Sequence, residues 1–449
     1  MAFVISESSP ITYPGPPPRS ADVVVIGGGV IGVCTALQLA KAGQNVVLCE
    51  KGRIAGEQSS RNWGWIRQTG RDPDELPVVA EANRLWQEHA NETNIDIGLR
   101  QVGISYLAAS DAEYARFQDW LVHAKTHGVD SRMLSKRETA ATTPDASRSF
   151  VGALHTASDL RAEPWVAVPA LAGIAVRKGA TLVENCAVRV LETTNGAITG
   201  VVTELGTINT NRVVVAGGAW SSLFLRRHGI DIPQLSVRAS VCKTQELPDI
   251  GEICASDGTV AWRRRDDGAY TLAAGGFHEL FIGPDAFRAL PSYWDQLKAD
   301  PFGRRYLGKA PKGYPDAWGT ARRWSGEEVS PFERMRVLDP SPNMKKLRSL
   351  AESFSGLFPS LGPVQITKAW GGMIDTMPDE IPVVDEAPDI VGLFIGTGFS
   401  GHGFGIGPGI GRVLADLAMG RNPVHDLSRF RIGRFADGSM LTPAQAGAL

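Results

Sequence analysis

Three glycines and a glutamate near the start of the chain have the spacing of a dinucleotide-binding motif. Gly27, Gly29 and Gly32 follow the pattern GxGxxG, and Glu50 comes about 20 residues later, where this motif carries an acid. The glycines let a pyrophosphate approach the backbone, and the acid accepts hydrogen bonds from ribose hydroxyls. Because the acid repels a phosphorylated ribose, the pattern predicts NAD or FAD and argues against NADP.

The residues around these glycines predict the strand–helix–strand context that the motif requires. Apolar runs predict buried strands over 23–26 and 45–49, and a stripe of small and apolar residues predicts a helix over 30–42. The start of that helix holds phosphates with its N–H groups and its positive dipole end. The residues expected to bind the cofactor here are Gly27, Gly29, Val30, Ile31, Gly32, Glu50 and Lys51.

A polar loop after Glu50 carries two tryptophans and an arginine in the run SSRNWGWIR, residues 59–67. A connection of this length in a compact domain is often functional. Trp63 and Trp65 either plug the core or form a wall against a flat ring system, and the residues alone leave both interpretations open.

The composition indicates an ordinary globular protein. The chain has 449 residues with 43% hydrophobic and 21% charged, which predicts two domains. The formal net charge of −2 does not indicate the basic surface that binds nucleic acid. The five cysteines lack the spacing of a metal or disulfide framework. There is no apolar run of the roughly 18 residues that span a bilayer. We therefore expect no metal, no nucleic-acid partner and no membrane span, and leave the oligomeric state open.

The first twenty residues hold five prolines and lack the basic and apolar regions of a signal peptide. They predict an extended arm that is either packed on the surface or mobile. A cytoplasmic location is expected.

The rest of the chain alternates between two secondary-structure patterns, one of short antiparallel strands and one of strands followed by helices. Residues 181–210 predict a β-meander with a turn at Asn195 and Gly196, and residues 212–216 predict a buried strand that ends at a glycine turn. Residues 235–276 predict short antiparallel strands with polar turns. The pattern returns to strand and helix after residue 364, with a helix expected over 409–419.

A second GxGxxG follows a predicted strand at Gly396, Gly398 and Gly401. No helix is expected to begin directly after it, and no second βαβ unit with a terminal acid follows. The sequence therefore predicts no second dinucleotide site and no NADPH site.

Three separated segments resemble the D-amino-acid oxidase family of FAD enzymes, which includes glycine and sarcosine oxidases. They are the N-terminal fingerprint with SSRN, the central VVVAGGAWS, and WGGMIDTMPDEIPVV with GTGFSGHGFGIGPGIGRVLADL. The resemblance covers about residues 22–422 and implies FAD rather than NAD. It implies an α/β FAD-binding Rossmann-like domain of the glutathione-reductase type, interleaved with an α+β substrate domain built on an antiparallel sheet.

The resemblance also implies domain boundaries and further cofactor residues. The expected parts are an arm (1–20), an FAD-binding domain (21–83, 155–230 and 364–430), a substrate domain (84–154 and 231–363) and a C-terminal tail (431–449). The further cofactor residues are Ser59, Ser60, Arg61, Asn62, Trp63, Gly64, Val188, Ala216, Gly217, Trp220, Gly372, Gly398, Phe399, Ser400, Gly401, His402 and Gly403. His402 is expected either as a charge partner of the reduced flavin or as a histidine bonded within its own loop.

The implied reaction is oxidation of a C–N bond in an amine or amino acid, with a secondary amine or an N-substituted or cyclic amino acid as the expected substrate. Hydride passes to the flavin, the imine hydrolyses, and oxygen takes the electrons to give hydrogen peroxide. One alternative is a dehydrogenase that uses a quinone or an electron-transfer protein. Another is a flavin-binding subunit of a heteromeric dehydrogenase.

The chain departs from the family at the positions that usually hold the substrate. The family's arginine after the WGGM segment is replaced by Ile374 and Asp375, and the lysine of sarcosine oxidases by Gly405. Sarcosine oxidases attach the flavin through a cysteine just ahead of the segment that matches MPDE, and this chain has Gly372 and Met373 in that neighbourhood, so we expect non-covalent FAD.

Arg67 is the remaining candidate to bind a carboxylate, and its alternative is an ion pair with Asp72 or Asp74. Arg67 and His402 are the expected catalytic residues. Trp63, Trp65, Arg67 and Trp370 are the expected substrate pocket. The arginines of the hairpin at 263–265 are expected on a solvated face rather than in the pocket.

Overall fold

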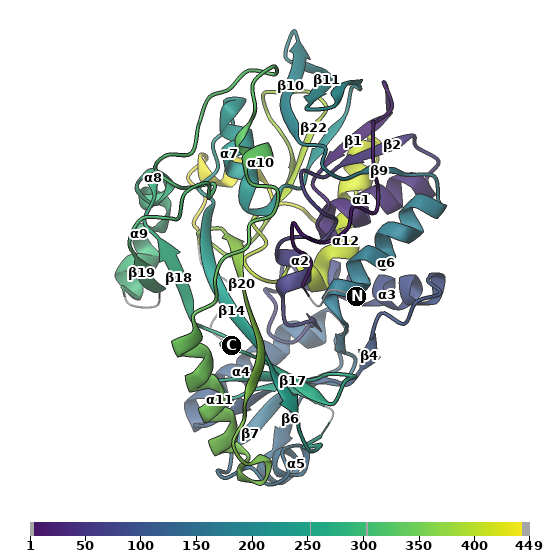
Figure 1. Ribbon diagram of the computed structural model, residues 1–449. Coiled ribbons are helices and arrows are strands. Elements are labelled where there is room, and N and C mark those ends of the chain that lie inside the picture. Colours follow the sequence, from purple (N-terminus) through teal and green to yellow (C-terminus); the bar gives the residue numbers. More distant parts are fainter. Residues whose placement is uncertain (1–3, 252, 302–303, 442–449) are drawn as a thin grey trace.

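The computed structural model describes residues 4–251, 253–301 and 304–441, and two large sheets with their helices make up most of it (Figure 1). The first sheet has six strands in the order β21-β22-β13-β1-β2-β9, and all are parallel except β21. The central strands β1, β2 and β13 are unbroken apolar runs because both faces of the sheet are buried, with Val23 and Val25 in one core cluster and Val24 in another. The strands are β1 (Val23–Ile26), β2 (Val46–Cys49), β9 (Thr181–Val183), β13 (Val213–Val215), β21 (Val383–Glu386) and β22 (Leu393–Thr397).

Four long helices pack beside this sheet, and their apolar faces form the largest core cluster with it. Gly29, the N-cap of the first helix, follows β1 directly, so the predicted strand–helix–strand unit is confirmed. The helices are α1 (Val30–Lys41), α3 (Leu76–Glu92), α6 (Pro164–Arg177) and α12 (Gly403–Ala418).

Helix α12 begins earlier than the sequence predicts, and the expected start at residue 409 is wrong. The glycines of the GFGIGPGIG run lie inside the helix because they let it approach α1 closely. A Cβ at Gly407 would lie 2.6 Å from Val30 Cγ2, and one at Gly411 would lie 2.4 Å from Cys34 Cβ. A helix therefore does follow the second GxGxxG directly. After α12 the described residues form the 3-10 helix η3 (Ile432–Phe435) and no strand, so no second βαβ unit is present there.

The second sheet is mainly antiparallel and is organised around the long strand β14 (Leu235–Glu246). Strand β20 (Ile366–Thr376) pairs with β14 along its length, and this pairing carries residues 366–376 into the second sheet. Helices α4 (Asp111–Thr126), α5 (Lys136–Thr142) and α11 (Met344–Leu357) pack on it. The other strands are β5 (Ile104–Ala108), β6 (Ser131–Ser135), β7 (Gly152–Thr156), β15 (Cys254–Ser256), β16 (Ala261–Arg264), β17 (Ala269–Ala273), β18 (His278–Phe281) and β19 (Arg304–Leu307).

Two small sheets complete the fold. The predicted meander is confirmed as β10 (Val188–Thr194), β11 (Ala197–Thr203) and β12 (Gly206–Asn209). Its turn residues Asn195 and Gly196 have φ of 51° and 77°, the conformation that Asn-Gly hairpins adopt. The other sheet joins β3 (Trp65–Ile66), β8 (Leu160–Arg161) and β4 (Arg100–Gln101).

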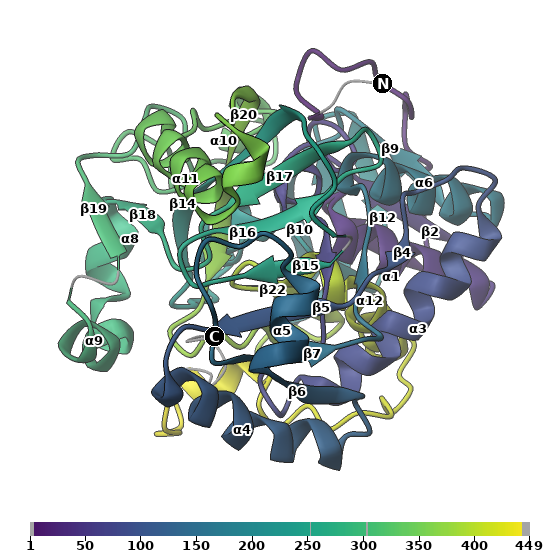
Figure 2. The same ribbon diagram turned by 90° about the horizontal axis from the view of Figure 1, so that it is seen from below.

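Short helices connect the longer elements, and α8 and α9 lie at the outer edge of the molecule beside β18 and β19 (Figures 1 and 2). They supply several of the side chains described below. They are α2 (Gln58–Arg61), η1 (Gly218–Trp220), α7 (Ser221–Arg227), α8 (Pro284–Arg288), α9 (Leu290–Ala299), α10 (Pro331–Arg334) and η2 (Pro359–Leu361).

The N-terminal arm is packed against the protein from residue 4 onward. Arg53 Nε donates to Ser9 O at 2.7 Å, and Arg61 Nη2 donates to Ile5 O at 3.1 Å. The Glu184 carboxylate accepts the backbone N–H of Tyr13 at 3.1 Å. Of the two expectations for the arm, packing is therefore the one that the described residues show. None of the described helices is both long and apolar enough to cross a membrane.

Candidate functional site

Two adjoining pockets run along the carboxyl ends of the parallel strands. The two share Gly29, Gln58, Ser59, Ala216 and Gly218 in their walls. They therefore form one elongated cavity, whose first half lies beside β1 and β2 and whose second half lies between α12 and the β14–β20 pair. This is where open α/β sheets bind ligands.

The glycine turn at the start of α1 leaves no room for side chains. Gly27 has φ of +110°, and a Cβ there would lie 2.4 Å from Ala216 O. A Cβ on Gly32 would lie 1.9 Å from Gly27 O, so the helix packs directly on the turn. Ser59 Oγ accepts the backbone N–H of Val30 at 2.8 Å, which brings the SSRN loop to the helix N-terminus. The turn is shaped to admit a phosphate group against its backbone.

Glu50 lies at the end of β2 and lines the first pocket. Its carboxylate accepts the N–H groups of Gly28 and Gly52, each at 2.6 Å. Burial raises the pKa of Glu50 to about 7, against the opposing effects of Lys51 and these two hydrogen bonds. The side chain is thus fixed on the glycine turn with lone pairs left for a ribose.

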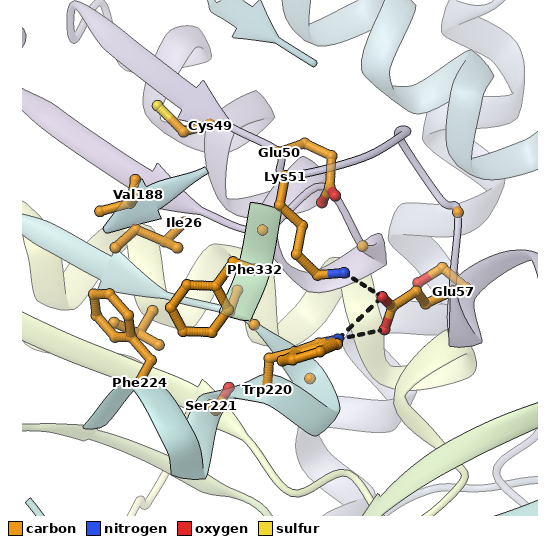
Figure 3. A pocket seen from close by; sticks show the side chains of 18 of the residues that line it. Ile26, Cys49, Glu50, Lys51, Glu57, Val188, Trp220, Ser221, Phe224 and Phe332 are labelled. Atoms are coloured by element: carbon orange, nitrogen blue, oxygen red, sulfur yellow. Dashed lines mark hydrogen bonds and ion pairs between the residues drawn. The ribbon is translucent and has the colours of Figure 1, made fainter. Parts of the chain in front are cut away.

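An interaction network closes the first pocket beside Glu50 (Figure 3). Lys51 Nζ contacts Glu57 Oε1 at 2.6 Å, and Trp220 Nε1 donates to the same carboxylate at 3.1 Å. The Lys51 ammonium also lies 4.5 Å from the centre of the Trp220 ring, within the range of a cation–π contact. Phe224 and Phe332 add an apolar wall. Sequence reasoning missed Glu57, Phe224 and Phe332 because no motif surrounds them.

The second pocket has an apolar lining. Trp63, Val241, Ile374, Phe399 and Phe404 contribute to its walls. Its charged residues are Arg61 and Asp375. The Arg61 side chain is 1% exposed, and its guanidinium pairs with Asp339 and donates to the carbonyls of Gly56, Gly371 and Ile5. Arg61 therefore holds the surrounding backbone together, and Asp375 is the remaining charge of this pocket.

The structure brings most of the predicted cofactor residues to the cavity walls. Those that line it are Gly27, Gly29, Val30, Ile31, Glu50, Lys51, Ser59, Arg61, Asn62, Trp63, Val188, Ala216, Gly217, Trp220, Gly372, Phe399, Gly401 and Gly403. The predicted cofactor residues outside the lining are Gly32, Ser60, Gly64, Gly398, Ser400 and His402. Three of the predicted substrate-pocket residues, Trp65, Arg67 and Trp370, also lie outside it. Trp370 supports the loop instead, because its Nε1 donates to Arg61 O at 2.8 Å.

Arg67 is linked to the second pocket through three aromatic rings. Trp63 meets Trp65 edge-on at 5.2 Å, Trp65 meets Tyr106 at 6.3 Å, and the Arg67 guanidinium lies 5.3 Å from the centre of the Tyr106 ring. The expected alternative partner of Arg67 is wrong, since Asp74 pairs with Arg429 at 3.2 Å. Within the described residues Arg67 pairs with no carboxylate, and its Nη1 donates to Thr69 O at 2.6 Å.

His402 caps α12 and contacts a different helix. Its Nε2 lies 2.7 Å from Glu75 Oε1, and Glu75 is the buried N-cap of α3. The expectation of a partner within its own loop is therefore wrong. The pair joins the N-termini of α3 and α12 beside the second pocket.

The hairpin arginines are mostly buried, contrary to the expected solvated face. Arg263 is 0% exposed, forms two hydrogen bonds with Glu163, and donates to Trp63 O at 2.6 Å. Arg265 is 4% exposed. Because neighbouring residues on a strand point to opposite faces, only Arg264 of the three is substantially accessible. Arg263 thus fixes the backbone of the loop that carries Trp63.

The residues of the cavity fit an FAD molecule. One half has the glycine turn, the Glu50 carboxylate and an apolar slot, as a phosphorylated adenosine requires. The other half extends the cavity beside the helix start of α12 and is wide, apolar and aromatic, as a flat ring system requires. A nucleotide with adenosine alone would occupy only the first half, so the second half fits the flavin part of FAD.

Comparison with known proteins agrees with this architecture. The family model described as FAD dependent oxidoreductase matches residues 22–417, and the chain belongs to this family. It is 27% identical to human mitochondrial sarcosine dehydrogenase over 433 residues, 94% of this chain and 42% of that protein. It is 26% identical to glycine oxidase of Pseudomonas aeruginosa, over 91% of this chain and 97% of the oxidase.

Solved structures show the same fold over nearly the whole chain. L-amino acid deaminase from Proteus myxofaciens, solved in complex with anthranilate, superposes with a TM-score of 0.89 at 30% identity. The superposition covers 97% of this chain and 96% of the deaminase. The predicted fold class and FAD cofactor are confirmed. The chain spans about two fifths of the length of the sarcosine dehydrogenase that it matches.

We expect FAD affinity to depend on pH through Glu50. Ribose hydroxyls donate to the charged carboxylate, and burial places the pKa of Glu50 at about 7 in the cofactor-free site. Below that pH, binding must remove a proton, so the affinity should fall by up to about tenfold per pH unit. Fluorescence titration of the apoprotein between pH 5.5 and 8.5 measures this. Glu50→Gln is the control: an equal slope in that variant would contradict the assignment.

Proposed function

We propose that this protein oxidises the C–N bond of an amino acid or related amine, with release of an imine that hydrolyses and with oxygen as electron acceptor. The observation that carries the proposal is the apolar, aromatic half of the FAD cavity, which is continuous with the nucleotide half. FAD supplies the two-electron acceptor when it is bound. The names of these relatives support the substrate class, since sarcosine, glycine and L-amino acids each contain an amine and a carboxylate.

The residues of the second pocket have positioning roles in this proposal. Trp63 and Phe404 form apolar walls that exclude water and orient a substrate carbon. The helix start at Gly403 points its positive dipole end toward the pocket, which favours negative charge there. His402 steadies that helix start through Glu75. No side chain needs to act as a strong base, because a neutral amine already carries the electron pair that drives its oxidation.

Arg67 is the proposed binding residue for a substrate carboxylate. It has no carboxylate partner among the described residues, and its guanidinium fork suits one. It lies behind Trp63 and Trp65 rather than in the pocket wall, so a substrate would have to reach it past these rings.

The experiment is anaerobic reduction of the holoprotein with a panel of primary and secondary amines and amino acids, followed by absorbance at the flavin band. We expect amino acids with a free or methylated amine to bleach the flavin and readmitted oxygen to restore the colour with peroxide. A yellow protein that no compound in the panel reduces would overturn the proposal. A flavin that reoxidises with a quinone but not with oxygen would replace oxidase by dehydrogenase.

We predict that Arg67→Met raises KM for carboxylate-bearing substrates about 100-fold, since a charge-assisted pair contributes roughly 3 kcal/mol. The kcat should change much less, and amines without a carboxylate should be unaffected. Steady-state kinetics with an amino acid and its decarboxylated amine measure the difference. Arg429→Met, which removes an arginine from the neighbouring surface pair with Asp74, is the matched control. Equal losses for both compounds would refute a carboxylate contact.

Three further expectations belong to this proposal. Non-covalent FAD is supported by the five cysteines, since Cys49 lines the nucleotide half and none lines the second pocket. The cytoplasmic location stays a prediction. The domain boundaries also stay predictions. They assign residues 366–376 to the FAD-binding domain, whereas strand β20, which holds these residues, pairs with β14 of the antiparallel sheet.

A further inference from the structure

Asp375 is a buried carboxylate in the wall of the second pocket. It lies near the end of β20 and is 2% exposed. Its Oδ2 accepts the backbone N–H of Gly398 at 2.7 Å and the hydroxyl of Thr397 at 3.3 Å. In the sequence, Ile374 and Asp375 stand where the family carries its substrate-binding arginine.

The bond to Gly398 fixes a strained turn between β22 and α12. Gly398, Ser400 and Gly401 have φ of +81°, +47° and +91°. Ser400 is held in addition because its N–H donates to the backbone oxygen of Asp375 at 2.8 Å and its Oγ accepts the N–H of Met377 at 3.2 Å. A non-glycine residue at positive φ persists only when its surroundings determine it. The start of α12 therefore depends on Asp375 for its position beside the pocket.

The same carboxylate reaches the junction of the two pockets. The side chain of Gln58 bonds to Asp375, and Thr397 Oγ1 also lies 2.9 Å from Gln234 Oε1. Gln234 Nε2 donates to Gly218 O at 3.0 Å. Gln58 and Gly218 line both halves of the cavity. Asp375 thus connects β20 and β22 to the loops on which the cofactor must lie.

In the part of the chain that the structure describes, no lysine or arginine neutralises this carboxylate. Among the described residues Asp375 forms no ion pair with a lysine or arginine, and the one arginine in the same pocket wall, Arg61, is paired with Asp339. Burial raises the pKa of Asp375 above its ordinary value, and the hydrogen bonds from Gly398, Gln58 and Thr397 oppose that shift because they stabilise the charged carboxylate. Charges interact more strongly in a buried site than in water. The charged form of Asp375 therefore opposes the gain of negative charge by any group in the pocket.

We propose that Asp375 is a positioning residue that holds the 397–401 turn against the flavin and whose charge makes the bound flavin harder to reduce. A reduced flavin gains negative charge, which a neighbouring carboxylate opposes. The inference rests on FAD binding and not on the choice of amine substrate. It predicts a property of the cofactor that is measured without any substrate.

The test compares Asp375→Asn with the natural holoprotein by anaerobic titration against reference dyes. Asparagine keeps an oxygen acceptor for the Gly398 N–H and removes the charge. We expect the equilibrium constant for two-electron reduction to rise at least about tenfold, which is about 30 mV, while FAD stays bound. Asp385→Asn is the matched control, because Asp385 also accepts a backbone N–H, from Ile432 at 2.9 Å, and lies outside both pockets.

An unchanged potential in an Asp375→Asn protein that retains FAD would overturn the inference. Should that variant fail to fold, Thr397→Val provides the second test, since it removes one donor to the carboxylate without altering the pocket lining. We expect its potential to rise, because loss of a hydrogen bond that stabilises the charged carboxylate favours its neutral form. A potential equal to that of the natural chain would overturn the inference there as well. Both outcomes are independent of whether any amine reduces the flavin.

Discussion

Gly32→Ala is expected to yield a protein that purifies without FAD. The added Cβ would lie 1.9 Å from the carbonyl oxygen of Gly27, far inside van der Waals contact. This oxygen belongs to the backbone, so no side chain can rotate away to relieve the clash. The helix must then move away from the turn, which displaces the N–H groups that receive the pyrophosphate. We expect FAD affinity to fall more than about 100-fold, or roughly 3 kcal/mol, and stability to fall by about 1–3 kcal/mol from overpacking.

The measurement is the ratio of flavin to protein absorbance after purification, followed by titration of the apoprotein with FAD. Gly356→Ala is the matched control, because Gly356 lies in helix α11 and a Cβ there meets nothing within 4 Å. That control should bind FAD normally and gain up to about 1 kcal/mol from helix propensity. A yellow Gly32→Ala protein with natural affinity would show that close packing at this glycine is not what admits the cofactor.

Arg434→Met is expected to lower the free energy of unfolding by about 3–5 kcal/mol. Arg434 and Asp379 are 2% and 0% exposed, and two hydrogen bonds of 2.8 and 3.1 Å join them. Methionine fills part of the volume but leaves the Asp379 carboxylate buried without its cation. Such a loss is a large share of the stability of a typical domain. Urea unfolding followed by fluorescence measures it on the holoprotein.

The control for this variant is Arg132→Met. Arg132 pairs with Glu138 at 2.7 Å, but the two side chains are 58% and 46% exposed. A surface pair of this kind contributes roughly 0–1 kcal/mol. Equal losses in the two variants would mean that the buried pair is not a major source of stability. The pair matters for the site because Asp379 lies two residues after Met377, whose side chain packs on the turn at Gly398.

The nucleotide half of the cavity could be predicted from the sequence because its signals are local. One short stretch of strand, turn and helix positions Gly27, Gly29 and Glu50. Their spacing in the sequence is therefore enough to predict how they lie relative to one another. The Asn195–Gly196 turn was predictable for the same reason, since two adjacent residues determine the backbone conformation. The family resemblance, carried by three separated motifs, narrowed the predicted cofactor from NAD or FAD to FAD.

The remaining differences come from contacts between distant segments. The start of α12 was misplaced because a run of glycines lowers helix propensity, whereas packing against Val30 and Cys34 makes small residues necessary. Arg263 was expected in solvent because a hairpin arginine usually lies there, yet Glu163, far away in the chain, offers it a buried partner. Glu57 and Phe332 carry no motif, and only the meeting of their segments places them at one pocket.

The amino-acid sequence by itself thus determined the cofactor class, the position of the pyrophosphate turn and the family, since each motif behind them consists of residues close together along the chain. The tertiary structure decided the environment at the other end of the cavity. It placed Arg67 behind the tryptophans, paired His402 with Glu75, and left Asp375 as a buried acid at the junction of the two pockets. Burial and charge pairing depend on which segments meet in space, and a local sequence pattern does not contain that information.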